Sequence, residues 1–435
     1  MNLRSPAFFI LCAVSLIASG GNMALQSVLP AIGREFHLSD TLVAGAFALS
    51  ALLWTLTSPV WARQSDLRGR KRVIMIGLWG FVVSMLGFGL AATSGLEHWL
   101  GAALAFTLMA VARSVYGLFG SAAPIASQAY VADRTTAAER TQAMSLLASA
   151  QGLGTVIGPV LAPFLVLPVI GLAGPMYVFA LIGAVALFVV WRRLPSGDAV
   201  RTPSPSGQAE HRGKGLWKDP RVRDFLLYGL LVTGAQAVNI SVLGFHVIDE
   251  LATAGSGLAA MTARQAQPFI GLAMLTGAIA TLMVQWGLIP LLRLQPRELM
   301  RWGAALALLG NLISILAPGY FGVVVGYAVV SMGVGFARPG FTAGSSIAVT
   351  AAEQGAVAGL MMSLAGLSFL APPVIGVALY ELSEPAPFVG NALLLIGALA
   401  AAWFSPALKA ARAAPDPTAP ADTPPASQPG PEGNR

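Results

Sequence analysis

Twelve long apolar runs occupy most of this 435-residue chain. A helix that crosses the hydrocarbon core of a bilayer needs about 20 predominantly apolar residues. Because 56% of the residues are hydrophobic and only 10% are charged, a water-soluble fold could not hide so much apolar surface. The sequence therefore predicts an all-α membrane protein with spanning helices at 7–31, 42–61, 73–95, 99–122, 142–166, 168–191, 225–248, 268–292, 299–317, 319–342, 354–380 and 386–406.

Two segments between or beyond these runs are too polar to bury a core. The stretch 195–223 is rich in Pro, Ser, Gly and charge, and 409–435 is dominated by Pro and Ala. Such compositions are typical of linkers and disordered tails. We expect a six-helix half at 1–194, a cytosolic linker, a second six-helix half at 224–408 and a disordered cytosolic tail.

The basic residues predict the orientation of the helices. Cytoplasmic loops of membrane proteins carry an excess of Lys and Arg. With the N-terminus in the cytosol, all but three of the 26 Lys and Arg residues lie at cytosolic segments; the exceptions are Arg34, Arg264 and Arg113. The first run is too long for the apolar core of a signal peptide. We therefore expect a multi-pass protein of the plasma membrane, in bacteria the inner membrane, with both termini cytosolic.

The chain also contains an internal repeat. Residues 138–162 align with 352–376 at an offset of 214, and 8 of 25 positions are identical, including Pro159 and Pro373. The repeat pairs the fifth expected helix with the eleventh. Two groups of six helices in the same orientation predict pseudo-symmetric halves, with a substrate site between them at the membrane midplane.

Several classes of site are excluded or disfavoured. Cys12 is the single cysteine, which excludes a disulfide framework and a cysteine-built metal site. The four histidines show no ligand spacing, and no phosphate-binding Gly-x-x-x-x-Gly-Lys-[Ser/Thr] loop occurs. We expect no catalytic residues, metal or cofactor, and no nucleic-acid partner, because the basic charge follows the topology. A membrane enzyme or receptor would require a clustered site that is absent.

The segment between the second and third helices reads Asp66-Leu67-Arg68-Gly69-Arg70-Lys71-Arg72. Its basic residues alone would anchor the loop in the cytosol, and Gly69 permits a tight turn. The segment resembles the signature of the major facilitator superfamily, Gly-x-Leu-Ala-Asp-Arg-x-Gly-Arg-Lys, although Ala62, Gln64 and Leu67 depart from it. The resemblance covers about residues 5–408 and is to the twelve-helix drug:proton antiporter branch of the family. It implies that this segment forms a latch between the two halves. Its residues would be Asp66, Gly69, Arg70, Lys71 and, from the segment after the fourth helix, Asp133.

Arg113 lies inside the fourth expected helix. A charge at the membrane centre costs at least about 2.5–3.5 kcal/mol on insertion scales, so it usually faces the bundle interior or water. The sequence Arg113-Ser114-Val115-Tyr116-Gly117 resembles the family motif Arg-x-x-Gln-Gly, with Tyr116 in place of Gln. The resemblance implies a role in proton coupling or substrate contact; the alternative is a structural arginine bound by carbonyl groups.

The fifth expected helix contains Gly154, Gly158 and Pro159. Glycines four residues apart let another helix approach closely, and a proline bends a helix. The pattern resembles the family's antiporter motif Gly-x-x-x-Gly-Pro-x-x-Gly-Gly, which is associated with exporters, although Ala162 and Pro163 replace its last two glycines. The alternative is a plain packing face.

No acidic residue falls in the middle of an expected helix. Many drug–proton antiporters of this family carry an acid within the first or fourth helix, so the usual proton acceptor is absent. Three explanations remain open: Asp249 or Glu250 lies deeper than its place near the outer face suggests, Asp66 or Asp133 carries the proton, or the coupling differs.

Uncharged polar side chains are further candidates to line a central cavity. Each could instead make an interhelical hydrogen bond worth about 1 kcal/mol. They are Asn22, Gln26, Gln151, Gln236 and Asn239.

These patterns favour a monomeric secondary transporter that exports small amphipathic molecules, such as drugs or metabolites, in exchange for protons. A cavity whose one central charge is Arg113 disfavours cations and tolerates neutral or anionic solutes. The alternative is proton-coupled uptake of an organic anion or another small nutrient. Arg113 without a partner acid favours uptake, and the glycine–proline motif favours export.

Overall fold

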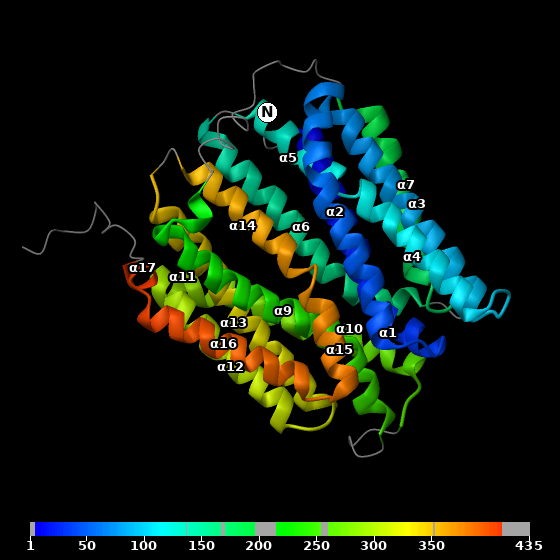
Figure 1. Ribbon diagram of the computed structural model, residues 1–435. Helices are drawn as coiled ribbons and strands as arrows, with labels where there is room; N and C mark the ends of the chain where they lie inside the picture. Colours follow the sequence, from blue (N-terminus) through cyan, green and yellow to red (C-terminus); the bar gives the residue numbers. More distant parts are fainter. Residues whose placement is uncertain are drawn as a thin grey trace, which may run out of the picture.

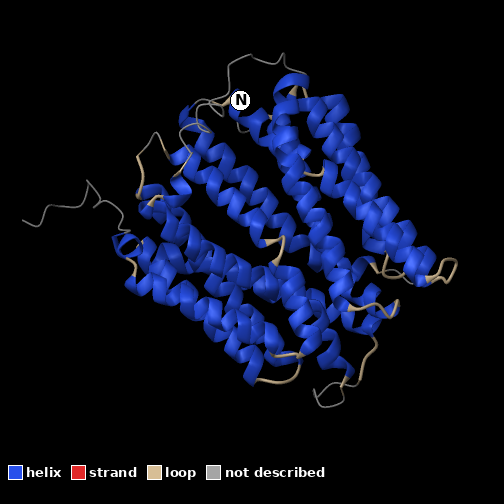
Figure 2. Cartoon of the chain, in the orientation of Figure 1, coloured by secondary structure: helices blue, strands red, loops and turns tan. Residues whose placement is uncertain are grey.

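The computed structural model describes residues 5–135, 137–166, 170–195, 215–253, 260–350 and 353–410. Within these ranges the chain forms helices and connecting turns, and no strand (Figure 2). Twelve helical stretches in the described part are long and apolar enough to cross a membrane. The predicted fold class and the predicted number of spans are confirmed.

The first half begins with three long helices, a span in two pieces, and two further helices. They are α1 (Pro6–Glu35), α2 (Asp40–Arg68), α3 (Arg70–Leu96), α4 (Ala102–Phe119) with α5 (Ala122–Arg134), α6 (Ala137–Leu165) and α7 (Gly174–Arg193). The fourth span was expected to end at 122, but it continues to Arg134. Hydropathy detects only the apolar part of this span, so Asp133 lies in the last turn of α5 instead of in a loop.

The second half follows a short 3-10 turn, η1 (Leu216–Lys218). Its helices are α9 (Pro220–Ala252), α10 (Ala263–Leu282) continued by the π-helical η3 (Met283–Leu288) and α11 (Ile289–Leu292), α12 (Pro296–Leu316), α13 (Tyr320–Ile347), α14 (Gln354–Ser368), α15 (Pro372–Leu382), α16 (Ala386–Phe404) and α17 (Pro406–Ala410). Most of the expected linker, and the tail beyond 410, lie outside the described residues, so the boundaries proposed for them stay a prediction.

The internal repeat takes two forms. In the first half α6 is continuous through Pro159. In the second half the equivalent span breaks between Ser368 and Ala371, and Pro373 lies in the first turn of α15. A proline removes one backbone hydrogen bond and crowds the preceding turn. The repeated proline therefore lies inside a continuous helix in the first half, as Pro159, and next to a break in the second half, as Pro373.

Small residues allow the helices of each half to pack closely. On α12, a Cβ atom added to Gly303 would lie 2.6 Å from the backbone nitrogen of Ala337, and one added to Gly310 would lie 2.5 Å from that of Val330 on α13. In the first half, a Cβ at Gly77 would lie 2.4 Å from the nitrogen of Ala123. Lipid supplies no hydrophobic force between helices, so close backbone contact of this kind holds a membrane bundle together.

The two ends of the bundle differ. We call the end where α1 begins and α17 lies the terminal end, and the end where α1 and α15 finish the distal end (Figure 1). At the distal end one continuous apolar core contains residues of both halves, among them Ile32 of α1, Val242 of α9 and Ile270 of α10. At the terminal end each half has its own core, around Leu78 in the first half and Phe225 in the second.

Candidate functional site

Arg113 of α4 is buried, with 4% of its surface exposed. One terminal nitrogen donates to Oδ1 of Asn22 on α1. The guanidinium carbon lies 4.5 Å from the ring centre of Phe47 and 4.7 Å from that of Tyr116. Aromatic faces attract a cation and offset part of its lost hydration. The structure thus brings together Arg113, Asn22 and Tyr116 from the expected set, and adds Phe47.

The arginine nevertheless keeps unused hydrogen-bonding capacity. Its Nε and second terminal nitrogen are buried and have no hydrogen-bond partner in the described part of the chain. No carboxylate there forms an ion pair with it. Buried donors without partners are costly, so this position suits a group that supplies an acceptor oxygen.

Packing around α4 fixes the arginine in place. Ser50 of α2 donates its hydroxyl to the carbonyl of Arg113 at 3.2 Å. A Cβ at Gly117 would lie 2.6 Å from the Ser50 carbonyl oxygen, so only glycine permits this approach. The Tyr116 ring packs against Trp54, with ring centres 5.4 Å apart. Tyr116 therefore belongs to an aromatic cluster, at the position of the Gln in the motif that this segment resembles.

The other polar candidates have different surroundings. Gln26 and Gln236 are half-buried and make no side-chain hydrogen bond to described residues. Asn239 is 4% exposed and donates to the Ala235 carbonyl at 2.9 Å and to Oδ1 of Asn311 at 3.3 Å. In this conformation its amide joins helices within the second half. Gln151 has an exposed side chain, and its carbonyl accepts the Ser19 hydroxyl at 2.7 Å.

The glycines and prolines of α6 contact two different helices. A Cβ at Gly154 would lie 2.3 Å from the carbonyl oxygen of Leu16, and one at Gly158 would lie 2.1 Å from that of Gly20, so α6 packs backbone to backbone against α1. Across the bundle, a Cβ at Gly271 of α10 would lie 2.9 Å from the carbonyl oxygen of Pro159. The motif therefore lies where α6 contacts the other half.

The expected latch residues all pair within the first half. Arg70 forms ion pairs with Asp66 and, at 2.9 Å, with Asp133. Lys71 donates to the carbonyl of Trp191 at 2.8 Å, and Gly69 forms the turn between α2 and α3 with φ 89°. None of these described contacts joins the halves.

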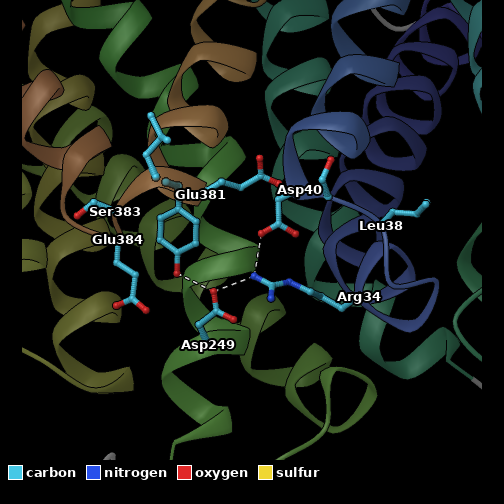
Figure 3. Close-up of a pocket in the computed structure, with 10 residues that line it drawn as sticks. Arg34, Leu38, Asp40, Asp249, Glu381, Ser383 and Glu384 are labelled. Carbon is cyan, nitrogen blue, oxygen red and sulfur yellow. Dashed lines mark hydrogen bonds and ion pairs between the residues drawn. The ribbon is translucent and has the colours of Figure 1, made fainter.

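A charged cluster at the distal end does join the halves. One terminal nitrogen of Arg34 lies 2.8 Å from Oδ2 of Asp40 and 2.8 Å from Oδ2 of Asp249 on α9 (Figure 3). Tyr380 of α15 donates its hydroxyl to the same Asp249 oxygen at 2.9 Å. We call Arg34, Asp40, Asp249 and Tyr380 the distal cluster.

A second contact across the halves lies beside the distal cluster. The backbone nitrogen of Thr41 donates to Oε1 of Glu381 at 3.0 Å, and the Thr41 hydroxyl donates to the other carboxylate oxygen. A cavity of about 480 Å³ lies among these side chains and is also lined by Glu384. The sequence placed these acids near the outer face, but it gave no sign that residues more than 200 positions apart would meet.

No described group of three or more His, Cys, Asp or Glu side chains is arranged to hold a metal ion.

The chain is similar in sequence to a known family and to several known proteins. A family model described as the Major Facilitator Superfamily matches residues 11–369. The chain is 27% identical over 425 residues to Multidrug resistance protein 1 of Bacillus subtilis (strain 168), covering 94% of this chain and 98% of that protein. It is 25% identical over 401 residues to the class B Tetracycline resistance protein of Escherichia coli, covering 86% and 89%.

Solved structures show the same fold. A mutant of the nucleoside transporter NupG aligns with a TM-score of 0.69 over 91% of this chain and 98% of that chain, at 11% identity. A bacterial homolog of the human lysosomal transporter Spinster, in an inward-facing and occupied conformation, aligns with a TM-score of 0.68 over 96% and 100%, at 13% identity.

Proposed function

The chain belongs to the major facilitator superfamily, and on that premise we propose that it is a proton-driven exporter of small amphipathic molecules such as drugs or metabolites. It is a multi-pass membrane protein of a family of small-molecule transporters. Its relation to multidrug and tetracycline resistance proteins along most of its length supports export of this solute class. In this proposal it works by alternating access and as a monomer.

The observation that carries the direction of transport is the double contact of α6. Its glycines pack against α1, and the carbonyl of Pro159 faces Gly271 of the other half. In antiporters this motif is associated with export, and here it lies between the halves. Residues that hold one end of the pathway shut while solute enters at the other must contact both halves. The position of the motif therefore supports a gating role for Gly154, Gly158 and Pro159.

We place the terminal end in the cytosol of a bacterium, because the basic residues concentrate there. The shared core and the distal cluster then close the outer end, and the separate cores lie at the cytosolic end. An exporter must load its solute from the cytosol. In this conformation the Asp66, Arg70 and Asp133 latch is not engaged across the halves; we propose that it stabilises the opposite conformation.

Arg113 is the proposed centre of solute recognition and coupling. Its two unpartnered nitrogens suit an acceptor oxygen on the solute, and the Phe47 and Tyr116 rings suit its apolar part. The proposed solutes are therefore amphipathic and neutral or acidic. Proton-coupled uptake of an organic anion is the second candidate, because no described carboxylate partners Arg113.

The test is transport into everted membrane vesicles with tetracycline as the probe. We expect a proton gradient, acidic inside, to drive accumulation and an uncoupler to abolish it. Arg113→Ala should reduce accumulation by about tenfold or more, since an interaction with a buried charge is typically worth over 1.4 kcal/mol. Arg264→Ala, at an exposed arginine, is the control.

Three results would each overturn a part of the proposal. Accumulation that survives full uncoupling would exclude proton drive. Gradient-driven accumulation found only in right-side-out vesicles would replace export with uptake. An Arg113→Ala protein as active as the wild type would remove the role assigned to that residue.

A further inference from the structure

His246 is a buried histidine at the distal end of α9 that the proposed function does not yet use. It is 5% exposed, and its Nε2 lies 3.5 Å from Oε1 of Glu250, one turn along the helix. Its ring is covered by Tyr380 of α15 and Phe388 of α16, with ring centres 5.8 and 5.0 Å away. Its Nδ1 is buried and has no partner among the described residues.

These contacts indicate which ring nitrogen of His246 is free to take up a proton. A neutral imidazole has one N–H and one lone pair. A neutral imidazole that places its N–H toward the Glu250 carboxylate, 3.5 Å from Nε2, carries its lone pair on the unpartnered Nδ1. Adding one proton there produces an imidazolium whose counterion, Glu250, is already in place. Glu250 is itself held by the backbone N–H of Gly319 at 2.9 Å.

Aromatic rings and charged side chains both surround His246. The two aromatic rings enclose the imidazole, and their faces favour a cation. Glu250 and Asp249 come from its own helix, Tyr380 from α15, and Arg34 of α1 lies beyond Asp249. Histidine is also the side chain whose charge ordinarily changes in the physiological pH range.

We propose that the His246–Glu250 pair is the site that binds the coupling proton, in place of the mid-membrane carboxylate that this chain lacks. This inference rests on the proposed proton-driven export. The sequence left open that Glu250 carries the coupling proton. In this proposal Glu250 is the counterion, and the proton binds to an imidazole nitrogen of His246.

The position of the pair explains how the proton would act on the gate. The adjoining cavity is lined by one cation, Arg34, and four carboxylates, Asp40, Asp249, Glu381 and Glu384. Such an excess of like charge is self-repelling. A proton on His246, whose ring contacts Tyr380, reduces the negative charge and favours the closed distal end. Loss of the proton restores the repulsion and favours opening, as exchange of solute for a proton requires.

The first experiment observes the proton directly. The chain has only four histidines, so histidine-labelled full-length protein in lipid nanodiscs should give few imidazole NMR signals. We expect a signal that is absent in His246→Gln and that moves between the neutral and cationic positions as pH falls from 8 to 5. Gln keeps a donor for Glu250 but cannot take up a proton. A His246 signal that stays constant over this range would overturn the proposal.

The second experiment separates coupling from binding in proteoliposomes, with tetracycline as the probe. We expect His246→Gln and Glu250→Gln each to lower gradient-driven accumulation by about tenfold, because neither variant keeps the complete proton-binding pair. Solute exchange without a gradient should stay within about twofold of the wild type. His98→Asn, at an exposed histidine with φ 58°, should behave as wild type in both assays.

The outcomes distinguish the two proposals. His246→Gln with wild-type accumulation overturns the assignment of the proton and leaves export intact. Wild-type protein that exchanges tetracycline but shows no gradient-driven accumulation overturns proton drive, and the assignment of the coupling proton with it. If the wild type does neither, export of tetracycline fails, and the NMR titration still decides whether His246 takes up the proton.

Discussion

The distal and terminal ends of this bundle are built from the same kinds of contact, used in different places. At the distal end, apolar packing and ion pairs both run between the halves, as in Ile32 with α9 and α10 and Arg34 with Asp249. At the terminal end, Arg70 pairs with Asp133 and Arg221 pairs with Glu353, each inside its own half. One end is therefore a joint between halves, and the other is two separate surfaces.

The difference indicates which contacts the proposed transport cycle would have to break. Ion pairs with partial exposure are worth about 0–1 kcal/mol each, so the distal cluster can open without a large penalty. Apolar burial is worth about 25 cal/mol per Å², so the shared core supplies most of the closure. A gate of this design is held by packing and adjusted by charge.

The largest effect is expected from Gly158→Ala, which disrupts the packing of α6 against α1. The added Cβ would lie 2.1 Å from the carbonyl oxygen of Gly20, a backbone atom that cannot rotate away. Overpacking of this kind typically costs about 1–3 kcal/mol. We expect a lower melting temperature and loss of transport, measured by thermal unfolding of purified protein and by vesicle accumulation.

Gly152→Ala on the same helix is the matched control. A Cβ there meets nothing within 4 Å, so stability and transport should match the wild type. Equal behaviour of the two variants would contradict the close approach of α6 to α1.

A smaller effect is expected from Arg34→Gln, which attacks the charge. Removing the one cation leaves Asp40 and Asp249 facing each other, at a cost of about 1–2 kcal/mol, and shifts the population toward an open distal end by about tenfold. The measurement is alkylation of a Ser383→Cys probe in a Cys12→Ser background. Ser383 lines the distal cavity.

Arg70→Gln provides the comparison at the other end. Its ion pairs lie within the first half, so the alkylation rate at position 383 should stay unchanged in this conformation. If both arginine variants raise the rate equally, the distinction between the two ends fails.

The smallest effect is expected at Glu353, just before α14. Hydrogen bonds from the backbone and hydroxyl of Thr350, together with Arg221, lower the pKa of the Glu353 carboxyl. Since this pKa lies below its unfolded value, the ionised group stabilises the fold above about pH 4, and the contribution is lost as pH falls through the lowered pKa. Glu353→Gln should lower the melting temperature by about 1–2 °C at pH 7 and by less at pH 3. A shift of the same size at both values would exclude the charge as its cause.

Much of the fold was predictable because lipid imposes length and apolarity on every span. The twelve helices followed from those two properties, and their grouping in two sixes followed from the repeat around Pro159 and Pro373. Helix ends were less predictable, as in the polar continuation of α5 to Arg134, because the bilayer does not limit a helix once it reaches water.

The candidate site was predictable only in part. Arg113 was identified because a charge is costly in an apolar run, and Asn22 was named as a candidate on another helix. The distal cluster was not, because its residues come from α1, α2, α9 and α15. His246 and Glu250 lie one turn apart on α9, but the sequence does not show that Tyr380 and Phe388 cover the imidazole. No local pattern marks Arg34 and Asp249 as partners. Such pairings depend on how two halves dock, a property of the whole bundle.

The break in the eleventh span gives the two halves different mechanics. The bonds of Tyr380 and Glu381 tie α15 to the closed end, and Ser368 at the break shares a hydrogen bond of 2.7 Å with Thr233 of α9. A continuous rod such as α6 transmits a tilt along its whole length. In the second half, a break bonded to α9 separates α14 from α15, so a tilt of one helix need not be transmitted to the other. The two spans related by the repeat are thus one continuous rod and one rod with a joint.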